Sequence, residues 1–154
     1  MKKSRSLLIL TLFLLLTAGV GSALAEMVAI KGNDINMRSG AGKKYKVLWK
    51  LGNGFPLKVL RRSGSWLRVQ DFEGTIGWVH KGVTSKSSHM IVKVHKKTKK
   101  KINIRSGPGT NKRIVAKAYY GVVFRTIKQK NGWVKVQHGS SVTGWVKRSL
   151  LWGF

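Results

Sequence analysis

The sequence predicts an all-β fold, with two small β-barrels in tandem behind a cleaved N-terminal segment. Three observations support this prediction. One stretch of sequence occurs twice at a fixed offset, and short apolar runs are separated by turn residues about every eight to twelve positions. In addition, no stretch after residue 25 shows a convincing helical period.

The internal repeat is carried by an eight-residue motif. Ile35–Gly42 is INMRSGAG, and Ile102–Gly109, 67 positions later, is INIRSGPG. The offset holds without a gap for the rest of each unit, where Gly-Trp-Val occurs at 77–79 and again at 144–146. Two copies of this length are too few for a solenoid and long enough for two barrels. The expected boundaries are a first barrel at 26–83, a polar linker at 84–90 and a second barrel at 91–154.

Each unit contains short runs that favour β-strands. In the first unit the expected strands are Met27–Ile30, Lys46–Leu51, Pro56–Leu60, Trp66–Gln70 and Ile76–Val79. The second unit repeats this pattern, and its Asn131-Gly132 pair is a strong signal for a tight hairpin. Units of about 60 residues form marginally stable cores, so most large apolar residues are expected to be needed inside.

The first 25 residues have the three parts of a secretory signal peptide. Positions 2–5 carry three basic residues, Leu7–Leu16 is almost wholly apolar, and Ala-Leu-Ala at 23–25 fits a small-x-small cleavage site. The alternative is an uncleaved anchor, but the apolar run is short for a membrane span of roughly 20 residues. We therefore expect cleavage after Ala25, export, and no membrane span in the remaining chain.

The second strong feature is the charge. The chain has 31 Lys and Arg residues against four acids, a formal charge of +27. Cleavage after Ala25 removes three basic residues and no acid, which leaves +24. Such a charge attracts polyanions over a long range. An exported protein meets the polyanions of the cell envelope, so we expect an anionic envelope polymer or an acidic envelope protein as partner, and no specific nucleic acid.

Both copies of the motif resemble the signature of bacterial SH3 domains, in which Asn, an apolar residue and Arg precede a small, glycine-rich turn. The later tryptophan before a basic strand and the Gly-Trp-Val of each unit are also similar to that family. The resemblance covers nearly all of the chain after residue 25. It implies SH3-like β-barrels of five to six strands, a location in the periplasm or on the surface of a bacterium, and binding to peptidoglycan stem or cross-bridge peptides. This sequence is far more basic than a typical member, and it shows no hydrolase domain beside its barrels.

The repeat supplies candidate ligand-binding residues at matching positions. They are Asn36, Arg38, Trp66 and Trp78 in the first unit, and Asn103, Arg105, Trp133 and Trp145 in the second. A forked guanidinium suits the carboxylate or carbonyl groups of a ligand. The alternative for each arginine is that it binds carbonyl groups of its own loop.

Strand alternation separates the tryptophans from the core. Leu67 and Val69 share one face of their strand, and Trp66 lies on the other with Arg68 and Gln70. Trp66 and Trp133 therefore fit either a platform for a ligand or a lid over the barrel end. Alternation does not settle Trp78 and Trp145, which we expect to be mainly structural. The aromatic residues that break the repeat are predicted to pack inside the barrels: Tyr45, Trp49, Tyr119 and Tyr120.

A basic run precedes the motif of the second unit. It contains Lys96, Lys97, Lys99, Lys100 and Lys101, and the matching stretch of the first unit is shorter and nearly uncharged. The run fits either a solvated loop or a polyanion-binding site. Polyanion binding of this kind weakens as salt is added.

The sequence offers no catalytic constellation. The acids Asp71 and Glu73 occur in one unit and are replaced by His138 and Ser140 in the other, so they are weak candidates for acid–base chemistry. The four histidines show no metal-ligand spacing, and the chain has no cysteine. We expect a binding protein with no catalytic residue, metal or cofactor.

Overall fold

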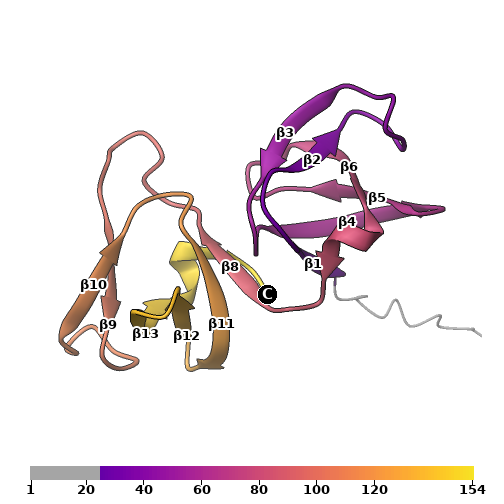
Figure 1. Ribbon diagram of the computed structural model, residues 1–154. Helices are drawn as coiled ribbons and strands as arrows, with labels where there is room; N and C mark the ends of the chain where they lie inside the picture. Colours follow the sequence, from indigo (N-terminus) through magenta and orange to yellow (C-terminus); the bar gives the residue numbers. More distant parts are fainter. Residues whose placement is uncertain (1–24) are drawn as a thin grey trace, which may run out of the picture.

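The structure, a computed structural model, describes residues 25–154 and contains two antiparallel β-sheets that follow each other along the chain (Figure 1). Apart from Ala25, the predicted signal peptide lies outside the described residues. Within residues 25–154, no helix has the length and hydropathy that a membrane-spanning helix requires. The all-β prediction is confirmed, since the helical turns of the two barrels are short 3-10 turns.

The first barrel contains seven strands and one 3-10 turn. Its elements are β1 (Met27–Ile30), β2 (Ile35–Arg38), β3 (Val47–Leu51), β4 (Pro56–Ser63), β5 (Trp66–Gln70), β6 (Ile76–His80), η1 (Lys81–Val83) and β7 (Thr84–Ser85). Four of the five strands expected from the sequence begin at the predicted residue, and the fifth begins one residue later. The sequence patterns did not predict β2 or the two-residue β7.

The second barrel repeats this arrangement. Its elements are β8 (His89–Val92), β9 (Ile102–Arg105), β10 (Ile114–Ala118), β11 (Val123–Lys130), β12 (Trp133–His138), β13 (Val142–Lys147), η2 (Arg148–Leu150) and β14 (Leu151–Gly153). The strand orders β3-β2-β6-β5-β4-β1-β7 and β10-β9-β13-β12-β11-β8-β14 are equivalent, position by position. At the hairpin after β11, Asn131 and Gly132 both have positive φ, as the predicted tight turn requires.

Each barrel has its own core. Strand alternation correctly placed Leu67 and Val69 inside the first barrel and Val134 and Val136 inside the second, since all four are fully or almost fully buried. The first core also contains Met37 from β2, and the second contains Ile104 from β9 at the matching position. Each hairpin that carries the repeated motif is therefore anchored to its barrel by a side chain in the core.

The glycine of each Gly-Trp-Val sequence permits the close packing of the hairpin against the barrel. A Cβ atom on Gly77 would lie 2.6 Å from the Met37 side chain and 3.0 Å from the Arg38 carbonyl oxygen. At Gly144 the corresponding distances are 2.6 Å to Ile104 and 2.8 Å to the carbonyl oxygen of Arg105. The strands can approach this closely only where one of them has no side chain.

The segment between the barrels is shorter than the predicted linker at 84–90. Thr84 and Ser85 form β7 and pair with β1, with Ser85 opposite Ala29. At the other end β8 already begins at His89. Only residues 86–88 lie between the strands of the two sheets, because residues 84–85 belong to the first barrel as a strand paired with β1.

The barrels also touch each other directly. Glu73, in the turn after β5, forms an ion pair with Lys96 (2.7 Å) and accepts a hydrogen bond from the Tyr120 hydroxyl. The ring of Tyr120 lies 5.3 Å from that of Phe72. At a second contact between the barrels, the His89 ring occupies the space that a side chain on Gly54 would fill.

The prediction that the non-repeated aromatic residues pack inside the barrels is wrong. Tyr45, Trp49 and Tyr119 are exposed, and 54% of Trp49 is accessible. They lie on or next to β3 and β10, which are the outermost strands of their sheets and have a neighbouring strand on one side only. Tyr120 packs between the barrels instead of within one.

Because β2 and β6 cross closely at Gly77, we expect one added methyl group at this residue to lower the stability of the protein. Gly77→Ala should destabilise the protein by about 1–3 kcal/mol, because the added carbon overlaps a core side chain and a backbone oxygen. The matched control is Gly52→Ala, where an added Cβ would meet nothing within 4 Å. Urea unfolding followed by circular dichroism measures both. Equal stabilities of the two variants would contradict the close crossing.

Candidate functional site

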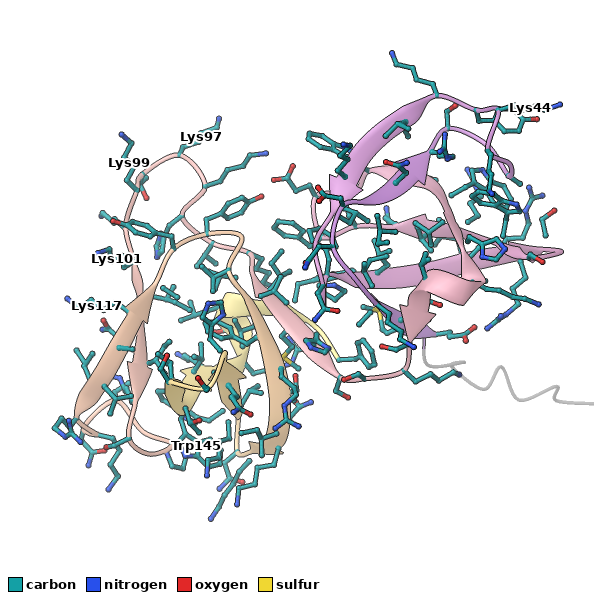
Figure 2. The ribbon with its side chains drawn as sticks, viewed as in Figure 1. Lys44, Lys97, Lys99, Lys101, Lys117 and Trp145 are labelled. Atoms are coloured by element: carbon teal, nitrogen blue, oxygen red, sulfur yellow. The ribbon has the colours of Figure 1, made fainter. Side chains whose placement is uncertain are left out.

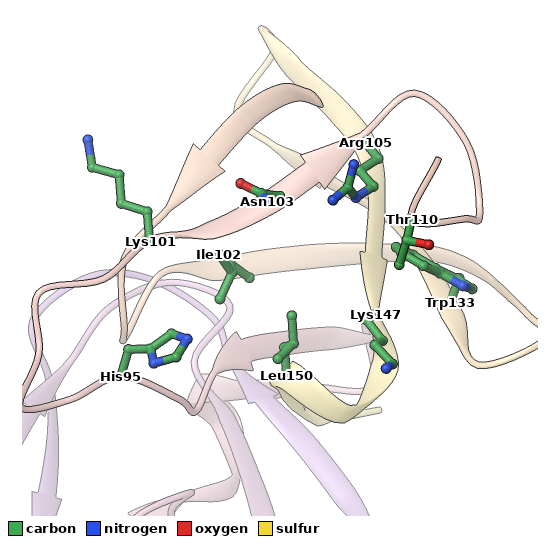
Figure 3. Close-up of a pocket in the computed structure, with 9 residues that line it drawn as sticks. All are labelled: His95, Lys101, Ile102, Asn103, Arg105, Thr110, Trp133, Lys147 and Leu150. Carbon is green, nitrogen blue, oxygen red and sulfur yellow. The ribbon is translucent and has the colours of Figure 1, made fainter. Parts of the chain in front are cut away.

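Each barrel has a surface pocket at the same place. In the first barrel it is lined by Asp34, Ile35, Asn36, Arg38, Lys43, Trp66, His80 and Val83. The residues 67 positions later, Lys101, Ile102, Asn103, Arg105, Thr110, Trp133, Lys147 and Leu150, line the second pocket together with His95 (Figure 3). We call these two sites the repeat pockets. Six predicted site residues, an Asn, an Arg and a Trp from each unit, meet in them.

Three parts of the barrel build each pocket. Strand β2 supplies Asn36 and Arg38, and β5 supplies Trp66 from the strand face opposite the core. The end of β6 contributes His80, whose ring lies 5.5 Å from that of Trp66 at 85°. The sequence patterns missed His80 and its counterpart Lys147, because these positions do not share a residue type. Their cross-strand pairing with the tryptophans identifies them.

Each pocket arginine binds its own loop. Nη1 of Arg38 donates to the carbonyl oxygens of Lys43 and Tyr45, both at 2.9 Å. Nη1 of Arg105 donates to the carbonyl oxygen of Lys112 at 2.8 Å. The alternative in which each arginine holds its own loop is therefore the one that the structure shows. The loops that rim the repeat pockets are fixed in place by the pocket arginines.

Asn36 carries an unused hydrogen-bond acceptor. Its side-chain oxygen Oδ1 is buried, and it is the one buried side-chain polar atom of residues 25–154 without a hydrogen-bond partner. Buried polar atoms almost always have a partner, because losing their contact with water is costly. An N–H or O–H donor of a ligand would satisfy this oxygen.

Trp78 and Trp145 lie beside the repeat pockets but do not line them. Each is opposite an arginine of the motif, with Trp78 paired to Arg38 and Trp145 to Arg105. They are only 9% and 8% exposed, although they face outward. Basic side chains cover them: the guanidinium of Arg61 lies 5.3 Å from the Trp78 ring, and Nζ of Lys128 lies 5.7 Å from that of Trp145. Both tryptophans are therefore cation–π partners of neighbouring basic side chains.

The lysine run forms the exposed loop between β8 and β9 (Figure 2). Lys97 and Lys99 extend into solvent at its tip. The two ends of the run are engaged in contacts, since Lys96 pairs with Glu73, and Nζ of Lys101 lies 4.6 Å from the ring of Tyr119. Lys101 also lines the second repeat pocket, so this loop brings positive charge directly to that site.

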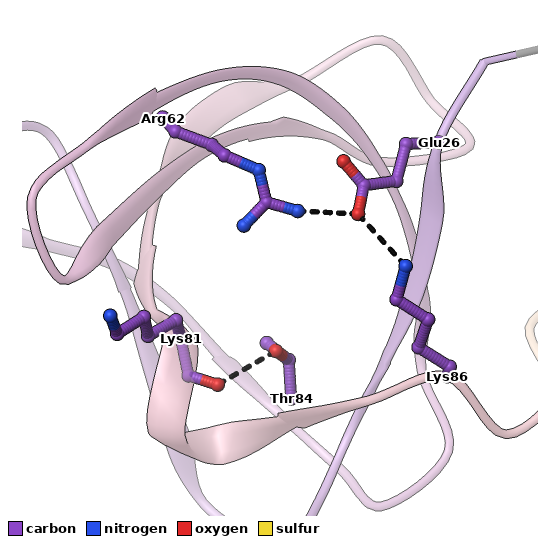
Figure 4. A network of polar contacts seen from close by, with 5 residues as sticks. All are labelled: Glu26, Arg62, Lys81, Thr84 and Lys86. Carbon is purple, nitrogen blue, oxygen red and sulfur yellow. Dashed lines mark hydrogen bonds and ion pairs between the residues drawn. The ribbon is translucent and has the colours of Figure 1, made fainter.

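Three of the four acids have structural roles. Oδ1 of Asp71 accepts hydrogen bonds from the backbone N–H groups of Glu73 (2.9 Å) and Thr75 (2.8 Å), which fixes the turn after β5. Glu73 binds Lys96 and Tyr120 of the second barrel. Glu26 binds Arg62 at 2.5 Å and Lys86 at 3.3 Å, which ties the start of β1 to β4 and to the segment between the barrels (Figure 4). No group of His, Asp or Glu residues suited to a metal ion occurs within residues 25–154.

Two small antiparallel barrels, each with a 3-10 turn before its last strand and a matching pocket, define a tandem SH3-like protein. A sequence profile described as bacterial SH3 domain matches residues 31–86 and, again, 98–153. The chain therefore belongs to the bacterial SH3 domain family, with two copies of the domain, as the repeat predicted.

Comparison with known proteins gives relatives that are longer than this chain. The chain is 29% identical over 140 residues to a putative N-acetylmuramoyl-L-alanine amidase, YrvJ, from Bacillus subtilis (strain 168). The match covers 87% of this chain and 27% of that protein. Among solved structures, NlpC2 and NlpC1 from Trichomonas vaginalis align with 84% and 85% of this chain and with 48% and 47% of their own. Their identities are 10% and 12%, and their TM-scores 0.37 and 0.35.

The ion pairs of Glu26 predict a pH-dependent contribution to stability. The hydrogen bond from Arg62 is the main cause that lowers the pKa of the Glu26 carboxyl below its ordinary value. A lowered pKa in the folded state stabilises the protein above the ordinary carboxyl pKa, and this contribution is lost as the pH falls through the lowered value. Glu26→Gln should therefore cost up to ~1 kcal/mol at neutral pH and nothing in strong acid.

Unfolding free energies measured from neutral to acidic pH test this expectation. The control is Asp34→Asn, which removes the same charge from a residue that forms no ion pair in the described structure. Its positive φ of 53° suits Asn as well as Asp. A Glu26→Gln difference that persists unchanged in acid would refute the assigned ion pairs.

Proposed function

We propose that this protein is an exported, non-catalytic component of the bacterial cell envelope that binds peptidoglycan peptides through its two repeat pockets. The observation that carries the proposal is the recurrence of one pocket, with the same Asn, Arg and Trp, in both barrels. Membership of the bacterial SH3 domain family and the similarity to a putative wall amidase support it.

The chemistry of the pockets suits a peptide. The unpartnered Oδ1 of Asn36 accepts a hydrogen bond from a ligand amide, and the half-buried Trp66 offers an apolar surface to a methyl or methylene group. Beside the two tryptophans, Lys147 attracts a carboxylate by its charge, and His80 can donate to one from Nε2 because its Nδ1 already accepts a backbone N–H. A short peptide with amide groups and a free carboxylate satisfies all three features.

The basic surface adds a second, less selective attraction. The predicted exported chain carries +24, and Lys97, Lys99 and Lys100 are exposed on the loop beside the second pocket. These charges attract anionic envelope polymer and raise the local concentration of protein at the wall. Two pockets on one chain also increase avidity where both reach the same wall layer.

The absence of catalysis is part of the proposal. Besides one isoleucine, the two pockets share an amide, a guanidinium and an indole, which bind and orient but do not exchange protons at neutral pH. Asp71 and Glu73, the acids nearest to each other in sequence, hold a turn and the neighbouring barrel. A second candidate function, binding of an acidic envelope protein, is favoured by the charge alone.

Sedimentation with purified peptidoglycan sacculi tests the proposed function. We expect the chain without residues 1–25 to pellet with sacculi, and to remain partly bound from roughly 50 mM to about 500 mM salt. Added salt screens exposed charges beyond about 10 Å, whereas contacts inside a pocket persist. Complete release by salt would mean that the protein is held as a polycation and that the repeat pockets do not recognise the wall.

Two substitutions connect that binding to the pockets. Trp66→Ala combined with Trp133→Ala should weaken binding at high salt about tenfold or more, because each pocket loses its apolar surface. The unfolding temperature should stay near that of the unsubstituted protein, since both side chains face away from the core. The control is Trp49→Ala, which removes an exposed tryptophan outside both repeat pockets. Loss of folding in the double variant would assign these tryptophans to the barrel, and equal binding of the double variant and the control would exclude the repeat pockets.

A further inference from the structure

Strands β3 and β10 are free edges of their sheets. Each pairs with one neighbour, β3 with β2 and β10 with β9, and each ends the strand order of its sheet. Figure 1 shows β10 at the outer margin of the second barrel. An edge strand exposes backbone N–H and C=O groups in extended conformation, which a further strand can pair with.

The exposed large apolar residues concentrate on these two edges. Seven of the ten in the described chain lie on β3, β10 or their flanks: Tyr45, Val47, Leu48, Trp49, Ile114, Val115 and Tyr119. Two pairs of them follow the repeat, since Val47 matches Ile114 and Leu48 matches Val115, and all four are more than a third exposed. The same unusual exposure therefore occurs twice at equivalent positions.

Proteins usually protect such edges, because exposed apolar edge strands pair with other chains. Neither edge contains proline, and the one charged residue in each strand is a lysine, Lys50 or Lys117, which opposes pairing with a basic strand but not with an acidic one. Each has one irregularity in its pairing, between Met37 and Arg38 in the first barrel and between Ile114 and Ala116 in the second. Beyond these irregularities the register is regular, over 49–51 in β3 and 116–118 in β10. The combination fits strands that receive a partner.

The charges around the edges select the partner. Lys44, Lys46 and Lys50 flank or belong to β3, and Lys112, Arg113 and Lys117 flank or belong to β10; of these, Lys46 matches Arg113 and Lys50 matches Lys117 in the repeat. A second copy of this chain would bring the same cations against them, which opposes self-association. A peptide strand with carboxylates and apolar side chains in alternation would match both the charges and the exposed apolar residues.

Hollows with apolar side chains lie at the ends of both edge strands. The one beside β10 is lined mainly by apolar residues, among them Ala116, Ala118, Val122 and Phe124. The equivalent one beside β3 combines apolar residues, Trp49, Leu51, Phe55 and Phe72, with charged ones, Lys50, Asp71, Glu73 and Lys96. Such a hollow can take one apolar side chain of an added strand, which is how strand addition gains selectivity. Neither hollow includes the Asn, Arg or Trp of the repeat pockets.

We propose that β3 and β10 each bind, by β-strand addition, an extended acidic segment of a partner protein. This surface is distinct from the repeat pockets, because no residue of β3 or β10 lines either of them. The proposal does not depend on the proposed wall binding, and either one can fail without the other.

The test uses a capped, fluorescein-labelled peptide of about ten residues in which valine and glutamate alternate, long enough to pair with a whole strand. Fluorescence anisotropy should show saturable binding to the chain without residues 1–25. Leu48→Lys combined with Val115→Lys should weaken it at least about tenfold, although the variant carries more positive charge. The matched control is Leu60→Lys with Ile127→Lys, which changes two equally exposed apolar residues away from the edges and should not weaken binding.

Two further peptides test the backbone pairing without changing the protein. They carry N-methyl groups on the odd or on the even residues, so that one of them cannot donate hydrogen bonds to the edge strand. Strand addition requires one N-methylated form to bind at least about tenfold more weakly than the parent peptide. Equal binding of all three peptides, tighter binding by the Leu48→Lys/Val115→Lys variant, or no saturable binding would overturn the proposal. Equal binding of the three peptides, or tighter binding by the variant, would mean that acidic peptides bind to the basic surface in general and not to the edge strands.

Discussion

The contact of the β2–β3 hairpin with its barrel is the constraint on which the rest of the structure depends. The register of β2 with β6 consists of one residue pair, Arg38 with Trp78, and the second barrel has the same single pair in Arg105 and Trp145. Gly77 and Gly144 make these crossings possible by leaving space for the core side chains of the hairpins. The arginine of each motif then fixes the following loop by donating to its carbonyl oxygens. A repeat pocket forms where the hairpin leaves the barrel, so the same few residues serve both folding and the candidate site.

The distribution of charge gives the molecule two kinds of surface. Acids are so few that Glu26, Asp71 and Glu73 are all used inside the structure, at the start of β1, in a turn and between the barrels. The remaining surface is basic, and it covers Trp78 and Trp145 with cationic side chains. Electrostatic attraction therefore surrounds the repeat pockets without giving them selectivity. Selectivity requires the groups that are fixed in position, above all the buried oxygen of Asn36.

Much of this arrangement could be predicted from the sequence, and the failures have physical causes. The 67-residue offset predicted two barrels, and strand alternation separated Leu67 and Val69 from Trp66. The prediction that Tyr45, Trp49 and Tyr119 pack inside was wrong, because it rested only on the demand of a small core for large residues, whereas these three lie on or next to free edges. The residue types at Arg38 and Arg105 were compatible with two roles, and only the geometry of the loop carbonyls distinguished them. The pairing of β7 with β1 has no sequence pattern, since two residues are too few to show one.

The contact between the barrels has a further consequence for assembly. Glu73 joins the first barrel to Lys96 and Tyr120 of the second, but the position equivalent to Glu73 in the second barrel is Ser140, and the position equivalent to Tyr120 in the first is Asn53. If a second molecule stacked on the first in the same way, the second barrel of one would have to contact the first barrel of the next. That second barrel lacks the carboxylate of Glu73, and that first barrel lacks the phenol of Tyr120. Head-to-tail contacts that can repeat indefinitely produce filaments. Here the asymmetry between two nearly equivalent domains limits this mode of stacking to a single pair.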